Sequence, residues 1–169
     1  MNPLQKVEEV YHRSFGKAYR AAKSICLNKQ LAEDAVSEAV VRLMKLAEKG
    51  RLRSEAENLF ITIAINEAKR ILSKRPAEYE YQEYLDARSC CDVEQREQAL
   101  DLLTKINTLP STLNMPLKLH YYGGFSYGEI SEALKISLDA VKKRVSRGRQ
   151  KLKEMYRDDE DMDGGFHEV

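Results

Sequence analysis

Residues 126–152, SYGEISEALKISLDAVKKRVSRGRQKL, have the pattern of two short helices joined by a tight turn. Ser126 followed by Glu129 is a capping-box pattern, in which the hydroxyl and the carboxylate each satisfy a backbone N–H at the start of a helix. The turn follows at Lys135 to Ser137, and Ser137 is placed to cap the second helix. This order of caps and turn predicts a helix-turn-helix.

The second helix of this unit has one apolar side and one basic side. Apolar or small residues recur every three or four positions and therefore share a side of the helix: Leu138, Val141, Val145, Gly148, Leu152 and Met155. Cationic and hydroxyl side chains occupy the remaining surface: Lys142, Lys143, Arg144, Ser146, Arg147 and Arg149. Such side chains suit phosphate contacts and guanine recognition in the DNA major groove. A basic face is also typical of a solvated bundle helix, but the preceding capped helix and turn favour DNA binding.

Helical periodicity also covers the first part of the chain. Apolar residues, among them Phe15, repeat at helical spacing, and Ser54 with Glu57 forms another capping-box pattern. The periodicity predicts three helices, over about residues 4–27, 31–49 and 54–74. Pro76 ends the third helix because proline cannot continue it.

The remaining segments divide the chain into parts. Residues 76–93 are acidic and rich in tyrosine without a steady period, and we interpret them as a flexible linker. Helical periodicity resumes near Glu94, and the last residues, 158–169, include six acidic residues and no lysine or arginine. We therefore expect an all-α fold of two small helical domains, 1–75 and 94–157, followed by an acidic, disordered tail at 158–169.

The formal net charge of +1 conceals blocks of opposite sign. Residues 1–75 carry +6 (15 basic, 9 acidic) and residues 110–157 carry +6 (10 basic, 4 acidic). Between them, residues 76–109 carry −5 (3 basic, 8 acidic), and residues 158–169 carry −6 (none basic, 6 acidic). Two basic blocks in one chain indicate nucleic-acid contacts at two places.

Composition and motifs exclude other classes of protein. No apolar stretch reaches membrane-spanning length and the N-terminus is too polar for a signal peptide, so we expect a cytoplasmic protein without membrane insertion. Three cysteines, Cys26, Cys90 and Cys91, fit a reducing compartment. The three histidines lie on different elements and no catalytic or phosphate-loop motif is present, so we expect no enzyme activity, no cofactor and no metal site.

The order of the motifs resembles that of bacterial sigma factors of the extracytoplasmic-function (ECF) group, which keep regions 2 and 4 of the sigma-70 family. Residues 32–38, AEDAVSE, with Arg42, resemble the region 2.2 helix that docks on RNA polymerase. Residues 59–66, LFITIAIN, and the following Lys74-Arg75 resemble regions 2.3 and 2.4, which open the −10 element and hold its single strand. Residues 109–149 resemble region 4, which recognises the −35 element.

The resemblance implies three sets of site residues. The −35 set combines the basic helix with the start of the helix before it: Ser126, Tyr127, Lys142, Lys143, Arg144, Ser146, Arg147 and Arg149. The −10 set is Asn58, Asn66, Lys69, Arg70, Lys74 and Arg75, and the polymerase-docking set is Asp34, Glu38 and Arg42. The implied partners are core RNA polymerase, promoter DNA and an anti-sigma factor that clamps both domains.

Two alternative functions remain open from the sequence. The chain resembles the family less closely late in region 2.4, where Arg70 and Ser73 replace common Asp and Arg residues. A sigma-like protein that binds polymerase without melting DNA is therefore one alternative. The other is a helix-turn-helix regulator whose first domain dimerises or senses a partner, although the basic groove and acidic stripe there favour a sigma factor.

Overall fold

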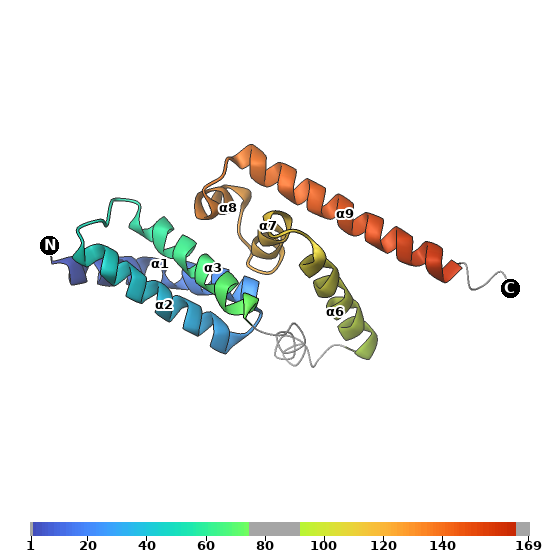
Figure 1. Cartoon of the computed structure of the whole chain (residues 1–169), viewed down its shortest axis with the longest axis horizontal. Coiled ribbons are helices and arrows are strands. Elements are labelled where there is room, and N and C mark those ends of the chain that lie inside the picture. Colours follow the sequence, from blue (N-terminus) through green and yellow to red (C-terminus); the bar gives the residue numbers. More distant parts are fainter. Residues whose placement is uncertain (1, 75–91, 165–169) are drawn as a thin grey trace.

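The structure is a computed structural model that describes residues 2–74 and 92–164. In these ranges the chain forms seven helices and no strand, as the all-α prediction requires (Figure 1). The predicted linker at 76–93 lies outside the described residues except for Asp92, which caps the next helix, and Val93, its first residue.

The first three helices form a bundle: α1 (Pro3–Cys26), α2 (Lys29–Glu48) and α3 (Ala56–Ser73). Its core is rich in alanines, and Ala18, Ala39 and Ala64 are fully buried. Small side chains let the helix backbones approach closely. Asn2 caps α1, and Leu27 ends it in the left-handed conformation at φ 52°.

Two expectations for this bundle are wrong. The helix α3 begins at Ala56 with Glu55 as its N-cap, so Ser54 lies one residue too early to cap it. Glu57 does not complete a capping box there and instead lies 3.6 Å from Arg13 on α1. Phe15 follows the predicted apolar spacing of α1 but is 38% exposed, and it lines a surface recess together with Tyr11.

The second group of helices contains the predicted helix-turn-helix. It comprises α6 (Val93–Thr108), α7 (Ser111–Tyr121), α8 (Tyr127–Leu134) and α9 (Leu138–Gly164). The Ser126 capping box is formed, Lys135 makes the turn at φ 55°, and the Ser137 hydroxyl accepts a hydrogen bond from the Ala140 N–H at 3.1 Å. The motif predicted from local caps is confirmed.

The apolar side of α9 packs on α7 and α8. Val141 and Val145 are buried, and Gly148 lies against Leu117, where an added Cβ would be 2.7 Å from Leu117 Cδ1. The absence of a side chain at Gly148 therefore allows the two helices to approach closely. Leu138 departs from the predicted seam and is 44% exposed, because it is the first residue of the helix, where the packed face ends.

The prediction of disorder at 158–169 is wrong for residues 158–164, which continue α9. Asp159 lies 2.8 Å from Lys105 on α6, and Lys105 also pairs with Asp101 at 2.6 Å. Hydrogen bonds to Asp101 and Asp159 raise the pKa of Lys105 above its ordinary value. A cation on the neighbouring helix thus offsets the acidic charge of this segment, and residues 165–169 lie outside the described residues.

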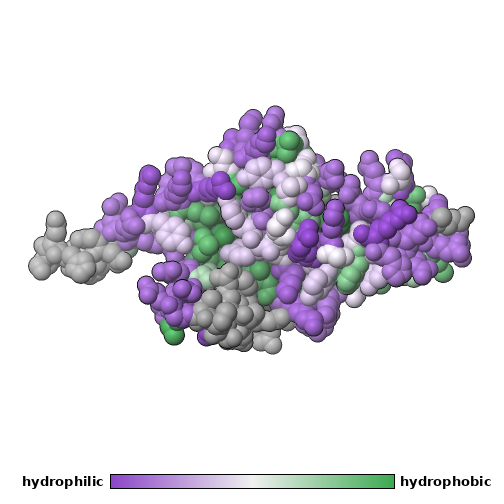
Figure 2. Space-filling view, turned by 180° about the vertical axis from the view of Figure 1, so that it is seen from behind, coloured by the Kyte–Doolittle hydropathy of each residue, from purple (hydrophilic) through white to green (hydrophobic). Residues whose placement is uncertain are grey.

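The two helical groups pack against each other, with α1 and α3 facing α7 and α8 (Figure 1). Most of their buried apolar residues form one continuous cluster, and Leu27 and Leu103 form a second, small one. The face shown in Figure 2 is mainly hydrophilic, with apolar residues gathered in recessed patches. Over the described residues, every helix is too short or too polar to cross a bilayer.

Candidate nucleic-acid interface

The basic face of α9 is open to solvent. Lys142, Lys143, Ser146 and Arg147 are exposed, and Arg144 is partly buried. Within the described ranges, none of the four cations among them forms an ion pair. Their hydrogen-bond donors are therefore available to an external acceptor, and the structure brings this part of the −35 set together on one helix.

Arg149 is held differently from the other cations of α9. Its guanidinium donates a hydrogen bond to the Tyr121 hydroxyl on α7 and lies 5.3 Å from the centre of that ring. Tyr121 was not singled out in the sequence. It fixes Arg149 at the edge of the basic face, where the planar guanidinium can still present other N–H groups.

Ser126 and Tyr127 lie at the start of α8. The Ser126 hydroxyl accepts a hydrogen bond from the Glu129 N–H at 3.1 Å, so its main role is structural. Tyr127 is half-buried and its ring centre lies 4.8 Å from that of His120. These contacts orient the first turn of α8.

The −10 set follows the polar side of α3. Asn66 and Lys74 are exposed, whereas Arg75 lies outside the described residues. The Asn58 amide donates to Glu132 on α8 at 3.5 Å, and the Lys69 ammonium donates to the Ser111 hydroxyl on α7 at 3.4 Å. Two members of the set are therefore already in contact with the second helical group.

A buried carboxylate joins the −10 set to the docking set. Glu67 is 1% exposed, and its two oxygens lie 2.7 Å from Arg42 Nε on α2 and 2.9 Å from Arg70 Nε on α3. A charge removed from water is stable only when it is paired. Arg42 and Arg70, expected to face separate partners, share this one carboxylate.

The rest of the docking set remains at the surface. Asp34 and Glu38 are exposed on α2, and Asp34 accepts a hydrogen bond from Gln30 at 3.2 Å. A recess of about 610 Å³ lies beside them, lined by Tyr11, Phe15, Glu33, Val36, Ser37 and Val40. Exposed carboxylates next to an apolar recess suit a protein-binding surface.

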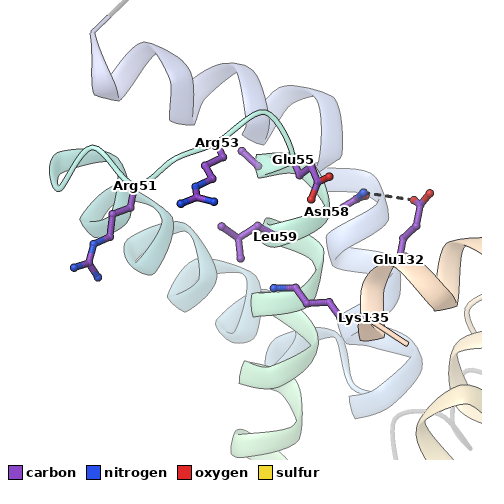
Figure 3. A pocket seen from close by; sticks show the side chains of 8 residues that line it. Arg51, Arg53, Glu55, Asn58, Leu59, Glu132 and Lys135 are labelled. Carbon is purple, nitrogen blue, oxygen red and sulfur yellow. Dashed lines mark hydrogen bonds between the residues drawn. The ribbon is translucent and has the colours of Figure 1, made fainter. Parts of the chain in front are cut away.

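A second cationic site was not predicted from the sequence. The loop before α3 and the end of α8 line a pocket of about 480 Å³, in which Arg53 and Lys135 point inward and Leu59 forms the apolar wall (Figure 3). Arg51 lies at its rim (Figure 3). Arg51, Arg53 and Lys135 lie outside the periodic helix faces, so they form no pattern in the sequence. Only the fold brings the loop and the end of α8 together.

Comparison with known families decides the identity of both helical groups. The family description "Sigma-70 region 2" matches residues 10–77, and "Sigma-70, region 4" matches residues 99–152. The chain belongs to the sigma-70 family. Region 2 of the family thus corresponds to the bundle of α1 to α3, and region 4 corresponds to most of the group from α6 to α9.

One curated relative is an ECF RNA polymerase sigma factor, SigE of Mycolicibacterium smegmatis. It is 24% identical over 154 residues, covering 87% of this chain and 60% of the relative. The chain therefore spans about three-fifths of that protein's length. The matches to both regions, taken together with this relative, support the ECF group. Among solved structures, CnrH in complex with the cytosolic domain of CnrY aligns with a TM-score of 0.58 at 17% identity. The alignment covers 92% of this chain and 90% of CnrH, which shows a shared fold across both regions.

Proposed function

We propose that this sigma-70 family member binds core RNA polymerase and directs promoter-specific initiation by recognising −10 and −35 elements. The main support is that one chain carries both a region 2 and a region 4, each with a cationic or polar face. A regulator that binds DNA only through a helix-turn-helix does not need a region 2. The chain forms no covalent bonds in this role, because the polymerase supplies the chemistry.

The −35 element is recognised by α9 in the major groove. Lys143, Ser146 and Arg147 reach base edges, and an arginine can donate two hydrogen bonds to a guanine. Lys142, Arg144 and Arg149 contact phosphates, and Ser126 and Tyr127 lie beside the DNA backbone. The exposure of Lys142, Lys143 and Arg147, which form no ion pair in the described residues, supports this assignment.

The −10 element is held as a single strand along α3. Asn58 and Asn66 offer hydrogen bonds to unstacked bases, and Lys69, Lys74 and Arg75 neutralise phosphates. Arg70 contributes its positive charge while it remains paired with Glu67. Phe60 is fully buried and offers no stacking surface, so polar contacts carry this recognition.

The docking surface consists of Asp34 and Glu38, supported by Arg42. An anti-sigma factor is the second partner that we propose, on the ground that CnrH was solved with the cytosolic domain of CnrY. The interactions with the polymerase and with the anti-sigma factor take place in the cytoplasm.

Co-migration with core RNA polymerase on a sizing column tests this function. Wild type should co-migrate, and the double variant Asp34→Lys/Glu38→Lys should lose the association. The matched control is Glu8→Lys/Glu9→Lys, which makes the same charge change on exposed positions of α1. Association by both variants would remove the docking assignment, and no association by wild type would leave a DNA-binding regulator. Association without initiation would indicate a sigma-like protein that cannot melt DNA.

A further inference from the structure

Glu67 places a negative charge on the apolar side of α3. It lies between Ala64 and Ala68, which are fully buried, and it is itself only 1% exposed. Removing a carboxylate from water costs free energy, and an apolar side chain of similar volume is often at least as stable in such a position. Packing alone therefore does not account for a glutamate here, and its contacts indicate what it does.

The two oxygens of Glu67 hold one arginine each, and both arginines are held by the same atom. Arg42 Nε lies 2.7 Å from Oε1, and Arg70 Nε lies 2.9 Å from Oε2. Nε is the guanidinium nitrogen closest to the main chain, so this pairing leaves the N–H groups of the terminal nitrogens to other acceptors. Among the described residues, these terminal nitrogens have no ion-pair partner.

The outer ends of the two arginines reach the surface. The side chain of Arg42 is 55% exposed and that of Arg70 is 42% exposed, whereas Glu67 is buried. Arg42 belongs to the docking set on α2 and Arg70 belongs to the −10 set on α3, and these two helices pack against each other. One buried carboxylate thus restrains a cation from each proposed site.

We infer that Glu67 is a positioning residue for both sites: it anchors each arginine by Nε and thereby presents the terminal N–H groups of Arg42 to the polymerase and those of Arg70 to the DNA strand. This inference rests on the proposed function. Glu67 itself touches neither partner, because it is buried. Its effect comes from preorganisation, since an arginine that is already held loses less side-chain freedom when a partner binds.

Charge and anchoring predict opposite effects on DNA binding when Glu67 is replaced by a neutral residue. Loss of the carboxylate raises the net charge by one unit, and attraction alone would then tighten the binding of a DNA strand. Loss of the anchor means that the strand itself must order Arg70, which weakens binding. The sign of the change therefore distinguishes a positioning residue from a carboxylate that only offsets cationic charge.

Two substitutions remove the anchor to different extents. Glu67→Gln keeps the shape of the side chain but has one acceptor oxygen, so it can hold at most one arginine. Glu67→Met holds neither arginine and fills the buried space with an apolar side chain. Because the half-exposed arginines can turn to water, this variant should remain folded. The matched controls are Glu57→Gln and Glu57→Met on the same helix, which make the same charge change at an exposed ion pair with Arg13.

Nuclear magnetic resonance of the full-length protein reports on the anchoring directly. An arginine Nε–H that donates to a carboxylate exchanges slowly with water, whereas that of a free side chain exchanges rapidly. Wild type and the Glu57 variants should show slowly exchanging Nε–H signals of Arg42 and Arg70, identified by their loss in Arg42→Lys and Arg70→Lys. Glu67→Met should lose both signals. Their absence from wild type, or their persistence in Glu67→Met, would overturn the anchoring.

Two titrations of the full-length chain measure presentation to the partners. One follows association with core RNA polymerase, and the other follows fluorescence anisotropy with a mixed-sequence single-stranded DNA of about 12 nucleotides. Relative to Glu57→Met, Glu67→Met should bind each partner about two- to tenfold more weakly, as expected when binding must order one additional arginine. Glu67→Gln should lose affinity for at least one of the two partners.

Equal affinities of Glu67→Met and Glu57→Met for both partners, or tighter strand binding by Glu67→Met, would overturn the positioning role. Failure of the proposed function would appear separately, as absent association of wild type with the core enzyme. The Nε–H signals require neither partner, so they test the anchoring in either case.

Discussion

The cations of α9 and those of α3 are arranged in opposite ways. On α9, Lys142, Lys143 and Arg147 face solvent without ion pairs in the described part of the chain. On α3, Arg70 is paired with Glu67 and Lys69 contacts Ser111. The two helices thus carry similar positive charge, but the cations of α9 are available to a ligand whereas Lys69 and Arg70 on α3 are already in contact with other residues. Only the packing of the chain distinguishes a free donor from an occupied one.

The largest expected effect comes from removing the carboxylate that occupies the cations of region 2. Glu67→Gln should lower the free energy of unfolding by about 2–3 kcal/mol, because it removes the buried charge with which both Arg42 and Arg70 are paired. Both arginines are about half exposed, which keeps the loss below that of a fully buried pair. Urea unfolding followed by circular dichroism measures it.

The control for Glu67 is another carboxylate on the same helix. Glu57 pairs with Arg13 at 3.6 Å, and its side chain is 48% exposed. Glu57→Gln should cost less than about 1 kcal/mol. Equal losses for the two variants would show that burial does not distinguish them.

The next effect concerns the open face of α9. Arg147→Ala should weaken duplex binding by about 1–3 kcal/mol and relax the preference at one base position. Lys142→Ala should weaken all sequences evenly and reduce the salt dependence by about one unit. Binding to a library of duplexes, scored by sequencing, measures both. An even loss across sequences for Arg147→Ala would assign base recognition to another residue.

A smaller effect compares one helix glycine from each region. In α1, an added Cβ at Gly16 meets nothing within 4 Å, so Gly16→Ala should stabilise the protein by about 0.5–1 kcal/mol. In α9, Gly148→Ala should destabilise it by about 1 kcal/mol because the Cβ meets Leu117. Thermal unfolding of the two variants checks the opposite signs, and a gain for both would show that α9 can move away from α7.

The smallest effect depends on pH. Burial raises the pKa of Glu129, but hydrogen bonds with Ser126 and the charge of Lys17 outweigh it and lower that pKa below 4.5. The carboxylate therefore contributes stability above about pH 4.5, and this contribution is lost as the pH falls through the lowered value. Glu129→Gln should lower the melting temperature at neutral pH, and this difference should shrink as the pH falls below 4.5. A difference that does not change with pH would contradict the role of the charge.

Local signals predicted region 4 well. The Ser126 and Ser137 caps and the Val141–Val145–Gly148 seam depend on residues close together in the sequence, and the structure contains all of them. The acidic end of α9 was misjudged because its stabilising cation, Lys105, lies on another helix. Composition alone does not reveal a stabilising partner on another helix.

Region 2 was harder to predict in detail because its important contacts link distant residues. Glu67 could have been noticed as a carboxylate between Ala64 and Ala68 on the buried side of α3, a position that demands a cationic partner. Nothing local indicated that the partners are Arg42 and Arg70. The contact of Thr62 with Ala133 joins the two regions and is visible only in the folded chain.

The most direct test of the whole account is transcription from a random promoter library by core RNA polymerase with this chain, followed by sequencing of the active promoters. We expect two enriched elements with wild type, and with Arg147→Ala a relaxed upstream element beside an unchanged downstream one. Initiation that does not depend on the chain, or a single enriched element, would contradict recognition of the promoter by two separate faces.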